Sequence, residues 1–147
     1  MNRVLLVIAI GLTIFSVTAK TTKPFTGTWC IGGERLVIEF VGTDSIHISS
    51  KADASINGRG VYTKNDTAFT ASLLNDGLSL KMGYRYEMKS SDKIKAKITF
   101  FTVDGDSVNH PRRWLRMSKC DDPEKFDFEA AEKEDAKLDA NSNEGKK

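Results

Sequence analysis

The sequence predicts an all-β protein, an antiparallel barrel of eight or nine strands, and three observations support this prediction. From Phe25 onward, apolar and polar residues alternate with a period of two, as in half-buried strands. Turn residues interrupt the alternation about every 8 to 12 residues, the spacing typical of β-sandwiches and barrels. Two cysteines, Cys30 and Cys120, lie at the first and last expected strands. Two cysteines at the first and last strands would lie close together if those strands were neighbours, as they are in a closed barrel. Closure also removes the unpaired edges that an open sheet of so many strands would leave.

Each strand is expected where the alternation places apolar residues on one face. Leu36, Ile38 and Phe40 share one face of the second strand, and Ile46 and Ile48 share one face of the third. The expected strands span residues 25–31, 34–41, 45–50, 60–64, 67–74, 78–82, 84–88, 93–101 and 112–119.

Glycine-containing turns separate these strands. Asn57-Gly58 and Asn75-Asp76-Gly77 are hairpin signals, and Asp104-Gly105-Asp106 is a third. After the last strand, Asp121-Asp122-Pro123-Glu124 resembles a helix start with proline at the first helical position. The sequence therefore predicts a short helix over 123–138, followed by a polar segment, 141–147, that we expect to be disordered.

Charge and hydropathy divide the chain into three parts. Residues 1–19 have a positive start, an apolar stretch and small residues up to Ala19, which predicts a cleaved signal peptide; an uncleaved anchor is the alternative. Residues 20–120, the expected barrel, carry 16 Lys and Arg against 10 Asp and Glu, a net charge of +6. Residues 121–147 form an acidic tail with 5 against 10, a net charge of −5, which we expect to fold over the basic face.

Export makes a disulfide between Cys30 and Cys120 the expected state of the two cysteines. Disulfides persist outside the reducing cytosol, and an even count leaves no free thiol. The alternative is a nucleophilic or metal-binding cysteine, for which only His47 and His110 could supply a base or a further imidazole ligand.

Two short motifs resemble the lipocalin, or wider calycin, pattern of small secreted β-barrels. Gly27-Thr28-Trp29 is similar to the Gly-x-Trp of its first strand, and Trp114-Leu115-Arg116 to the end of its last strand. The resemblance implies a structural Trp29 at the closed end of the barrel, with Arg116, or alternatively Arg113, packed across the indole ring.

The chain also departs from that family. It is shorter than a full lipocalin, and it lacks a recognisable middle motif, a long first loop and the flanking helix in their usual order. Its opening, 25–29, is similar to that of the avidins. The several tryptophans of a biotin site are absent, however, since only Trp29 and Trp114 are present.

No catalytic motif is found. The sequence has no Gly-x-Ser-x-Gly and no phosphate-binding glycine loop, and Glu34 and Glu39 fall on opposite faces of one strand. His47 and His110 are interpreted as solvated side chains, and Asp104 with its neighbours as a hairpin turn instead of a cation site. We therefore expect no enzyme activity, no cofactor and no metal.

Two sets of residues remain as candidates for binding. An interior ligand site is expected at five aromatic side chains, Tyr62, Phe69, Tyr84, Tyr86 and Phe100. The comb of Lys93, Lys95 and Lys97 is either a solvated face that discourages edge pairing or a surface for an anionic partner.

The leading hypothesis is an exported binding protein for a small apolar or amphipathic ligand. The alternative is a secreted or periplasmic protein-binding module, of inhibitor or immunity type, that uses the outer basic surface for an anionic envelope component or a protein. We expect a monomer that neither binds nucleic acid nor resides in the membrane.

Overall fold

A computed structural model describes residues 25–110 and 112–143, so the expected signal peptide lies outside the described residues. The helix α1 (Phe128–Asn143) follows the last strand. The strands are β1 (Gly27–Ile31), β2 (Leu36–Val41), β3 (Ser45–Ser50), β4 (Asn57–Lys64), β5 (Ala68–Asn75), β6 (Leu78–Ser90), β7 (Lys93–Val103), β8 (Asp106–Ser107) and β9 (Leu115–Lys119).

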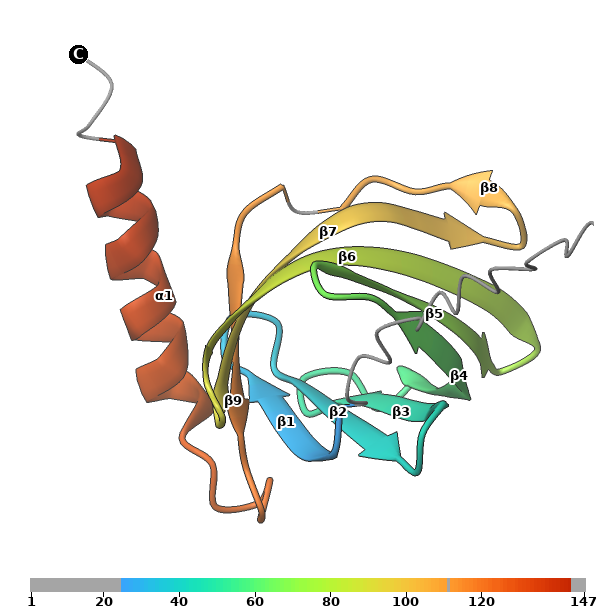
Figure 1. The fold of residues 1–147 in the computed structure, drawn as a ribbon, viewed down its shortest axis with the longest axis horizontal. Helices are drawn as coiled ribbons and strands as arrows, with labels where there is room; N and C mark the ends of the chain where they lie inside the picture. The colour runs from blue at the N-terminus through green and yellow to red at the C-terminus, as the bar shows by residue number, and fades with distance from the viewer. Residues whose placement is uncertain (1–24, 111, 144–147) are drawn as a thin grey trace, which may run out of the picture.

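Eight of these strands form a closed antiparallel barrel (Figure 1). Each strand from β1 to β7 pairs with the next, and β9 pairs with both β7 and β1 to complete the ring. The short β8 lies outside the ring and pairs only with β7 among the described strands. The fold class is confirmed, and closure leaves no strand of the ring with a free edge.

Tight turns set the register of the long hairpins. Asn75 pairs with Leu78, so Asp76 and Gly77 alone form the turn, with φ of 53° and 80°. Two positive φ values define the type I′ turn, whose twist matches that of the flanking strands. The turn at 104–105 has the same form, with φ of 49° and 89°.

The inward face of every long strand contributes to one apolar core. The buried members include a group of aromatic rings at one end and aliphatic side chains along the rest of the barrel. They are Phe25, Trp29, Ile31, Ile38, Phe40, Ile46, Ile48, Tyr62, Phe69, Ala71, Leu73, Tyr84, Tyr86, Ile94, Ala96, Leu115 and Met117.

A second, smaller cluster lies on the outside of the barrel, around the disulfide. Cys30 and Cys120 are bonded, as expected, with their Cα atoms 5.9 Å apart. Both are buried with Val37, and Phe126 and Phe128 of the C-terminal segment pack against them. The disulfide therefore links β1 to the residue after β9, and it is part of an apolar surface on which the C-terminal segment packs.

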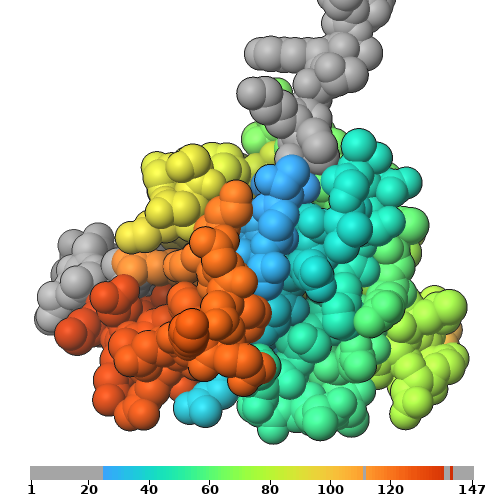
Figure 2. Space-filling view, turned by 90° about the horizontal axis from the view of Figure 1, so that it is seen from below, coloured from blue at the N-terminus to red at the C-terminus, as the bar shows by residue number. Residues whose placement is uncertain are grey.

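The helix α1 lies close against the barrel because Gly32 has no side chain. A Cβ at Gly32 would lie 2.5 Å from the Ala131 Cβ and 2.8 Å from the Glu132 backbone nitrogen. Figure 2 shows the C-terminal segment, in orange and red, beside β1 in blue. The first half of α1 therefore packs against the barrel, with contacts that reach Asp135.

Four expectations about the elements are corrected. The helix begins at Phe128 instead of residue 123, because the Asp127 carboxylate caps it by accepting a hydrogen bond of 2.9 Å from the Ala130 N–H. It also continues to Asn143, into the segment expected to be disordered. Asn57-Gly58 lies within β4, and the two strands expected over 78–88 are one, β6.

Candidate functional site

The aromatic residues expected to line an interior site pack against one another. Tyr62, Phe69, Tyr84 and Tyr86 are only 2% to 4% exposed. Phe69 stacks on Tyr84 with ring centroids 4.5 Å apart, and Phe25 contacts Tyr86 at 5.0 Å. The rings thus fill this part of the barrel, and ligand contact by these four residues stays a prediction.

The buried tyrosine hydroxyls have partners within the protein. Tyr62 donates to the Phe25 carbonyl at 3.2 Å, and Tyr84 donates to the Met82 sulfur at 3.4 Å. Burial, with a smaller contribution from the nearby Glu34 charge, raises the pKa of Tyr84 well above its usual range. The Tyr84 hydroxyl therefore stays protonated, and the Tyr62 and Tyr84 hydroxyls both bond within the core.

The fifth expected ligand residue, Phe100, lies on the outer face of the barrel, which corrects its predicted inward orientation. Its side chain is 38% exposed. Phe100 pairs with Gly83, and a Cβ at Gly83 would lie 2.2 Å from the ring. Met82 and Tyr84, the neighbours of Gly83, both pack toward the core, so Gly83 itself faces outward because successive residues of a strand alternate. The Phe100 ring covers this outward side of Gly83.

Trp29 is buried in the core, and its cationic neighbour is Lys119 instead of the expected Arg116. The indole is 2% exposed and donates from Nε1 to the Thr26 carbonyl at 3.0 Å. The Lys119 ammonium lies 6.0 Å from the ring centroid, in the place expected for Arg116. Arg116 alternates with the core residues Leu115 and Met117, so its side chain extends from the outer face, away from Trp29.

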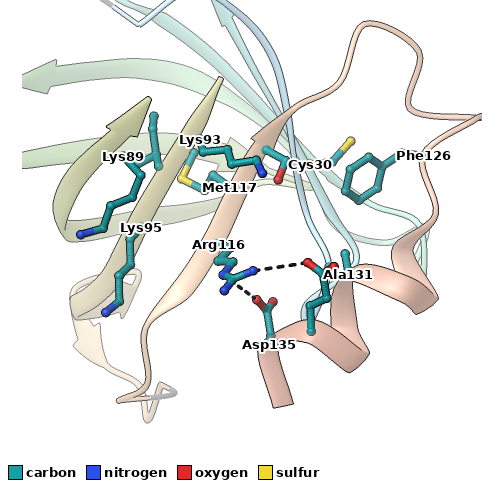
Figure 3. A pocket seen from close by; sticks show the side chains of 13 residues that line it. Cys30, Lys89, Lys93, Lys95, Arg116, Met117, Phe126, Ala131 and Asp135 are labelled. Atoms are coloured by element: carbon teal, nitrogen blue, oxygen red, sulfur yellow. Dashed lines mark hydrogen bonds and ion pairs between the residues drawn. The ribbon is translucent and has the colours of Figure 1, made fainter. Parts of the chain in front are cut away.

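A groove lies outside the barrel, between α1 and the wall made by β1, β6, β7 and β9. Its volume is about 400 Å³. Cys30, Phe126 and Ala131 give it apolar walls, and Lys93 and Arg116 extend from its β7 and β9 side (Figure 3). The other lining residues are Gly32, Lys89, Ile94, Lys95, Met117, Ser118, Glu134 and Asp135.

The cations of the groove differ in how far they are already neutralised. The Arg116 guanidinium contacts Glu134 at 3.3 Å and Asp135 at 3.9 Å, both on α1. Lys93 forms no ion pair within residues 25–110 and 112–143, and Figure 3 shows its ammonium turned into the groove toward Cys30. The groove thus combines an available positive charge with apolar walls.

The expected lysine comb is split between two environments. Lys93 and Lys95 line the groove, and the Lys95 ammonium lies 4.9 Å from the centroid of the Trp114 ring. Lys97 lies outside the groove and pairs across the strands with Arg85. The acidic helix reaches Arg116 and, at 3.6 Å, Arg35, so it does not cover the whole basic surface.

Sequence reasoning missed the residues that build the far wall of the groove. Phe126 falls in the helix expected over 123–138 but precedes α1 in the structure, and the aromatic pair of Phe126 and Phe128 in an otherwise polar segment is a signal for packing. Gly32 is not among the expected site residues. Its contact with α1 joins segments about 100 residues apart, which no local pattern reveals.

The described residues show no arrangement for metal binding. No three side chains of His, Cys, Asp or Glu converge to hold an ion in the part of the chain that the structure covers. His47 contacts Asn57 and Glu39 at the surface, with Nε2 2.6 Å from the Asn57 Oδ1 atom. Among the same residues, no helix is long and apolar enough to cross a bilayer.

Comparison with known proteins adds no assignment to this geometry. No protein-family model matches the chain, and neither the curated proteins nor the solved structures contain a match.

Proposed function

We propose that this protein is an exported, lipocalin-like binding protein without catalytic activity, and that it holds an anionic amphiphile in the groove beneath α1. The ligand class is a small molecule with an acidic head group, such as a phosphate or carboxylate, and an apolar chain. The observation that carries the proposal is the pairing of the Lys93 ammonium with the apolar walls at Phe126 and Ala131.

The dimensions and chemistry of the groove support this assignment. Small-molecule sites have volumes of roughly 300 to 1,000 Å³ and combine apolar walls with a few convergent polar groups. The groove has a volume of about 400 Å³ and contains both kinds of residue. The barrel interior is a weaker candidate for the ligand site. The centroids of its neighbouring aromatic rings are 4.5 to 6.2 Å apart, which is the distance of rings in contact.

Export and family membership belong to the same proposal. The disulfide is in keeping with an oxidising compartment, and the closed eight-stranded barrel with a buried Trp29 near its first strand's start is in keeping with the lipocalin resemblance.

Isothermal titration calorimetry with dodecyl phosphate, below its micelle concentration, tests the proposal. We expect one molecule to bind per chain, and we expect the neutral dodecyl maltoside to bind much more weakly. Lys93→Gln should weaken binding by roughly tenfold or more, because it removes a charge-assisted hydrogen bond. Phe126→Ser should weaken it through the lost apolar wall.

Two control variants locate the ligand. Lys125→Gln removes an exposed lysine outside the groove and should leave binding unchanged. Tyr84→Phe removes an interior hydroxyl and should also leave it unchanged. If Tyr84→Phe abolishes binding while Lys93→Gln does not, the ligand lies inside the barrel and the groove assignment is wrong.

A further inference from the structure

The outer surface of β6 and β7 carries a second feature, which shares only Lys95 with the groove. We call it the cationic face and define it by the outward side chains of Lys81, Arg85, Lys95 and Lys97 together with the Phe100 ring. Lys81 pairs with Thr102, Arg85 with Lys97, and Gly83 with Phe100. These pairs occupy successive outward positions of one long hairpin, so the side chains form one surface.

Like charges lie directly opposite one another on this face. Arg85 is opposite Lys97 in the pairing of β6 with β7, and Lys95 is opposite Arg116 in the pairing of β7 with β9. Like charges at directly opposed positions destabilise a sheet. The acids of α1 contact Arg116, so the cost falls on the pair of Arg85 and Lys97, and an anionic partner that contacts the face would offset it.

The protein itself leaves most of this charge without a counter-ion. Lys81, Arg85 and Lys97 form no ion pair with any residue that the structure describes. Glu87 lies opposite Lys95 but bonds to Lys89 at 2.7 Å, and this bond, with Lys95 and Arg85 adding to it, keeps the pKa of Glu87 below its usual value. The acids of α1 contact Arg116 and Arg35 instead.

An exposed aromatic ring lies among these charges. Phe100 has Lys97 near it on its own strand, and Lys81 and Arg85 flank the facing Gly83. The absence of a Cβ at Gly83 provides the space in which the ring rests. A large apolar side chain surrounded by lysine and arginine is the composition of surfaces that bind anionic bilayers, where the ring enters the head-group region and the cations meet phosphates.

We propose that the cationic face docks the protein on an anionic lipid bilayer. Charge complementarity favours this partner. Single-stranded nucleic acid binds by stacking successive bases on several aromatic side chains. Among the described residues of this face, the rings are Phe100 and, against Lys95, Trp114, which do not form a row and so disfavour nucleic acid. The face and the groove share only Lys95 of the residues named here, so the docking surface does not depend on occupation of the groove.

Vesicle co-sedimentation with the full chain tests this proposal. The vesicles contain equal parts of phosphatidylglycerol and phosphatidylcholine, and vesicles of phosphatidylcholine alone measure any binding through the N-terminal segment. We expect binding to the anionic vesicles to exceed that reference. It should fall when the ionic strength rises from about 0.1 M to about 1 M, which shortens the Debye length from about 10 Å to about 3 Å.

A charge variant assigns the binding to this face. The triple variant Lys81→Gln, Arg85→Gln, Lys97→Gln should bind anionic vesicles about 100-fold more weakly, given the contribution of each cation near a membrane surface. The matched control Arg59→Gln, Lys125→Gln, Lys133→Gln has the same net charge and should retain most of the binding. An equal loss in the two variants would show that only net charge matters and would overturn the proposal.

The Phe100 ring is tested separately. Phe100→Ser leaves the charge unchanged and should weaken vesicle binding by roughly tenfold, because the apolar insertion is lost. Tighter binding of a single-stranded oligonucleotide than of the vesicles, lost in the same triple variant, would assign the face to nucleic acid and overturn the proposal. The triple variant keeps Lys93 and Phe126, so dodecyl phosphate binding in solution reports on the groove independently.

Discussion

Tyr84 shows at the scale of one residue how the packed interior constrains the protein. Its side chain is 2% exposed, its ring stacks on Phe69, and its hydroxyl donates to the Met82 sulfur. Burial raises the pKa of this hydroxyl above the value of 10.0 for an unperturbed tyrosine. The neutral hydroxyl is tolerated in the core, whereas the phenolate would lose its hydration there.

The raised pKa predicts a loss of stability in alkali. Above pH 10 the unfolded chain releases the Tyr84 proton while the folded chain keeps it, so the free energy of unfolding falls as the pH rises, by about 1.4 kcal/mol per pH unit from this group. Between pH 10 and pH 12, Tyr84→Phe should lose roughly 2 kcal/mol less stability than the wild type in urea unfolding. Parallel stability curves over this interval would contradict the assignment.

Single residues also show where prediction from the sequence ends. The alternation correctly places Tyr62, Phe69, Tyr84 and Tyr86 in the core. It fails at Phe100 because the pairing of β6 with β7 shifts register between Gly83 and Tyr84. A bulge inserts one residue and reverses the alternation beyond it, and the sequence carries no local sign of such a bulge.

At the scale of elements, the docking of α1 decides whether the groove exists. The helix contacts the barrel through Phe128, Ala131 and Asp135, whose spacing of three and four residues places them on one face. The charge pattern of α1 is visible in the sequence. The surface on which α1 packs is formed by the disulfide and Gly32, and Gly32 is about 100 residues before the helix in the chain. The sequence therefore predicts the helix, but it predicts the basic face as the surface on which the tail lies, instead of the surface around Gly32 and the disulfide.

Gly32→Ala should release α1 from the barrel. The new Cβ would lie 2.5 Å from the Ala131 Cβ and 2.8 Å from helix backbone, so the helix has to move away. We expect faster hydrogen exchange of the α1 amides, with the barrel strands unchanged. Gly58→Ala is the matched control, because its Cβ would meet its nearest atom at an ordinary 3.4 Å. Unchanged hydrogen exchange in α1 would show that the contact between residue 32 and the helix adapts to the larger side chain.

At the scale of the whole molecule, the disulfide joins the first strand of the barrel to the residue that follows the last strand. Cys30 and Cys120 are separated by 90 residues. Closing a loop of that length restricts the unfolded chain by about 4 to 5 kcal/mol in the chain-entropy model. This is a large part of the stability of a small domain, which is about 5 to 15 kcal/mol.

Removal of the disulfide should therefore cost the molecule much of its stability. Cys30→Ala with Cys120→Ala should lower the free energy of unfolding by about 4 kcal/mol in guanidinium titrations. The reduced wild-type protein serves as the control, because it retains both sulfur atoms and lacks only the bond. A reduced protein as stable as the oxidised one would show that packing of Phe126 and Phe128 on the cluster matters more than the cross-link.

The pairing of β1 with β9 also sets the order in which the protein can be made. Trp29 pairs with Lys119 and Ile31 with Met117, so the first strand finds its second neighbour only in the last one. On the ribosome, β1 is synthesised long before that neighbour and keeps an open edge until nearly the whole barrel has emerged. Ring closure and the disulfide therefore wait until β9 has been synthesised, and until then the nascent chain exposes the strand edge that the finished barrel hides.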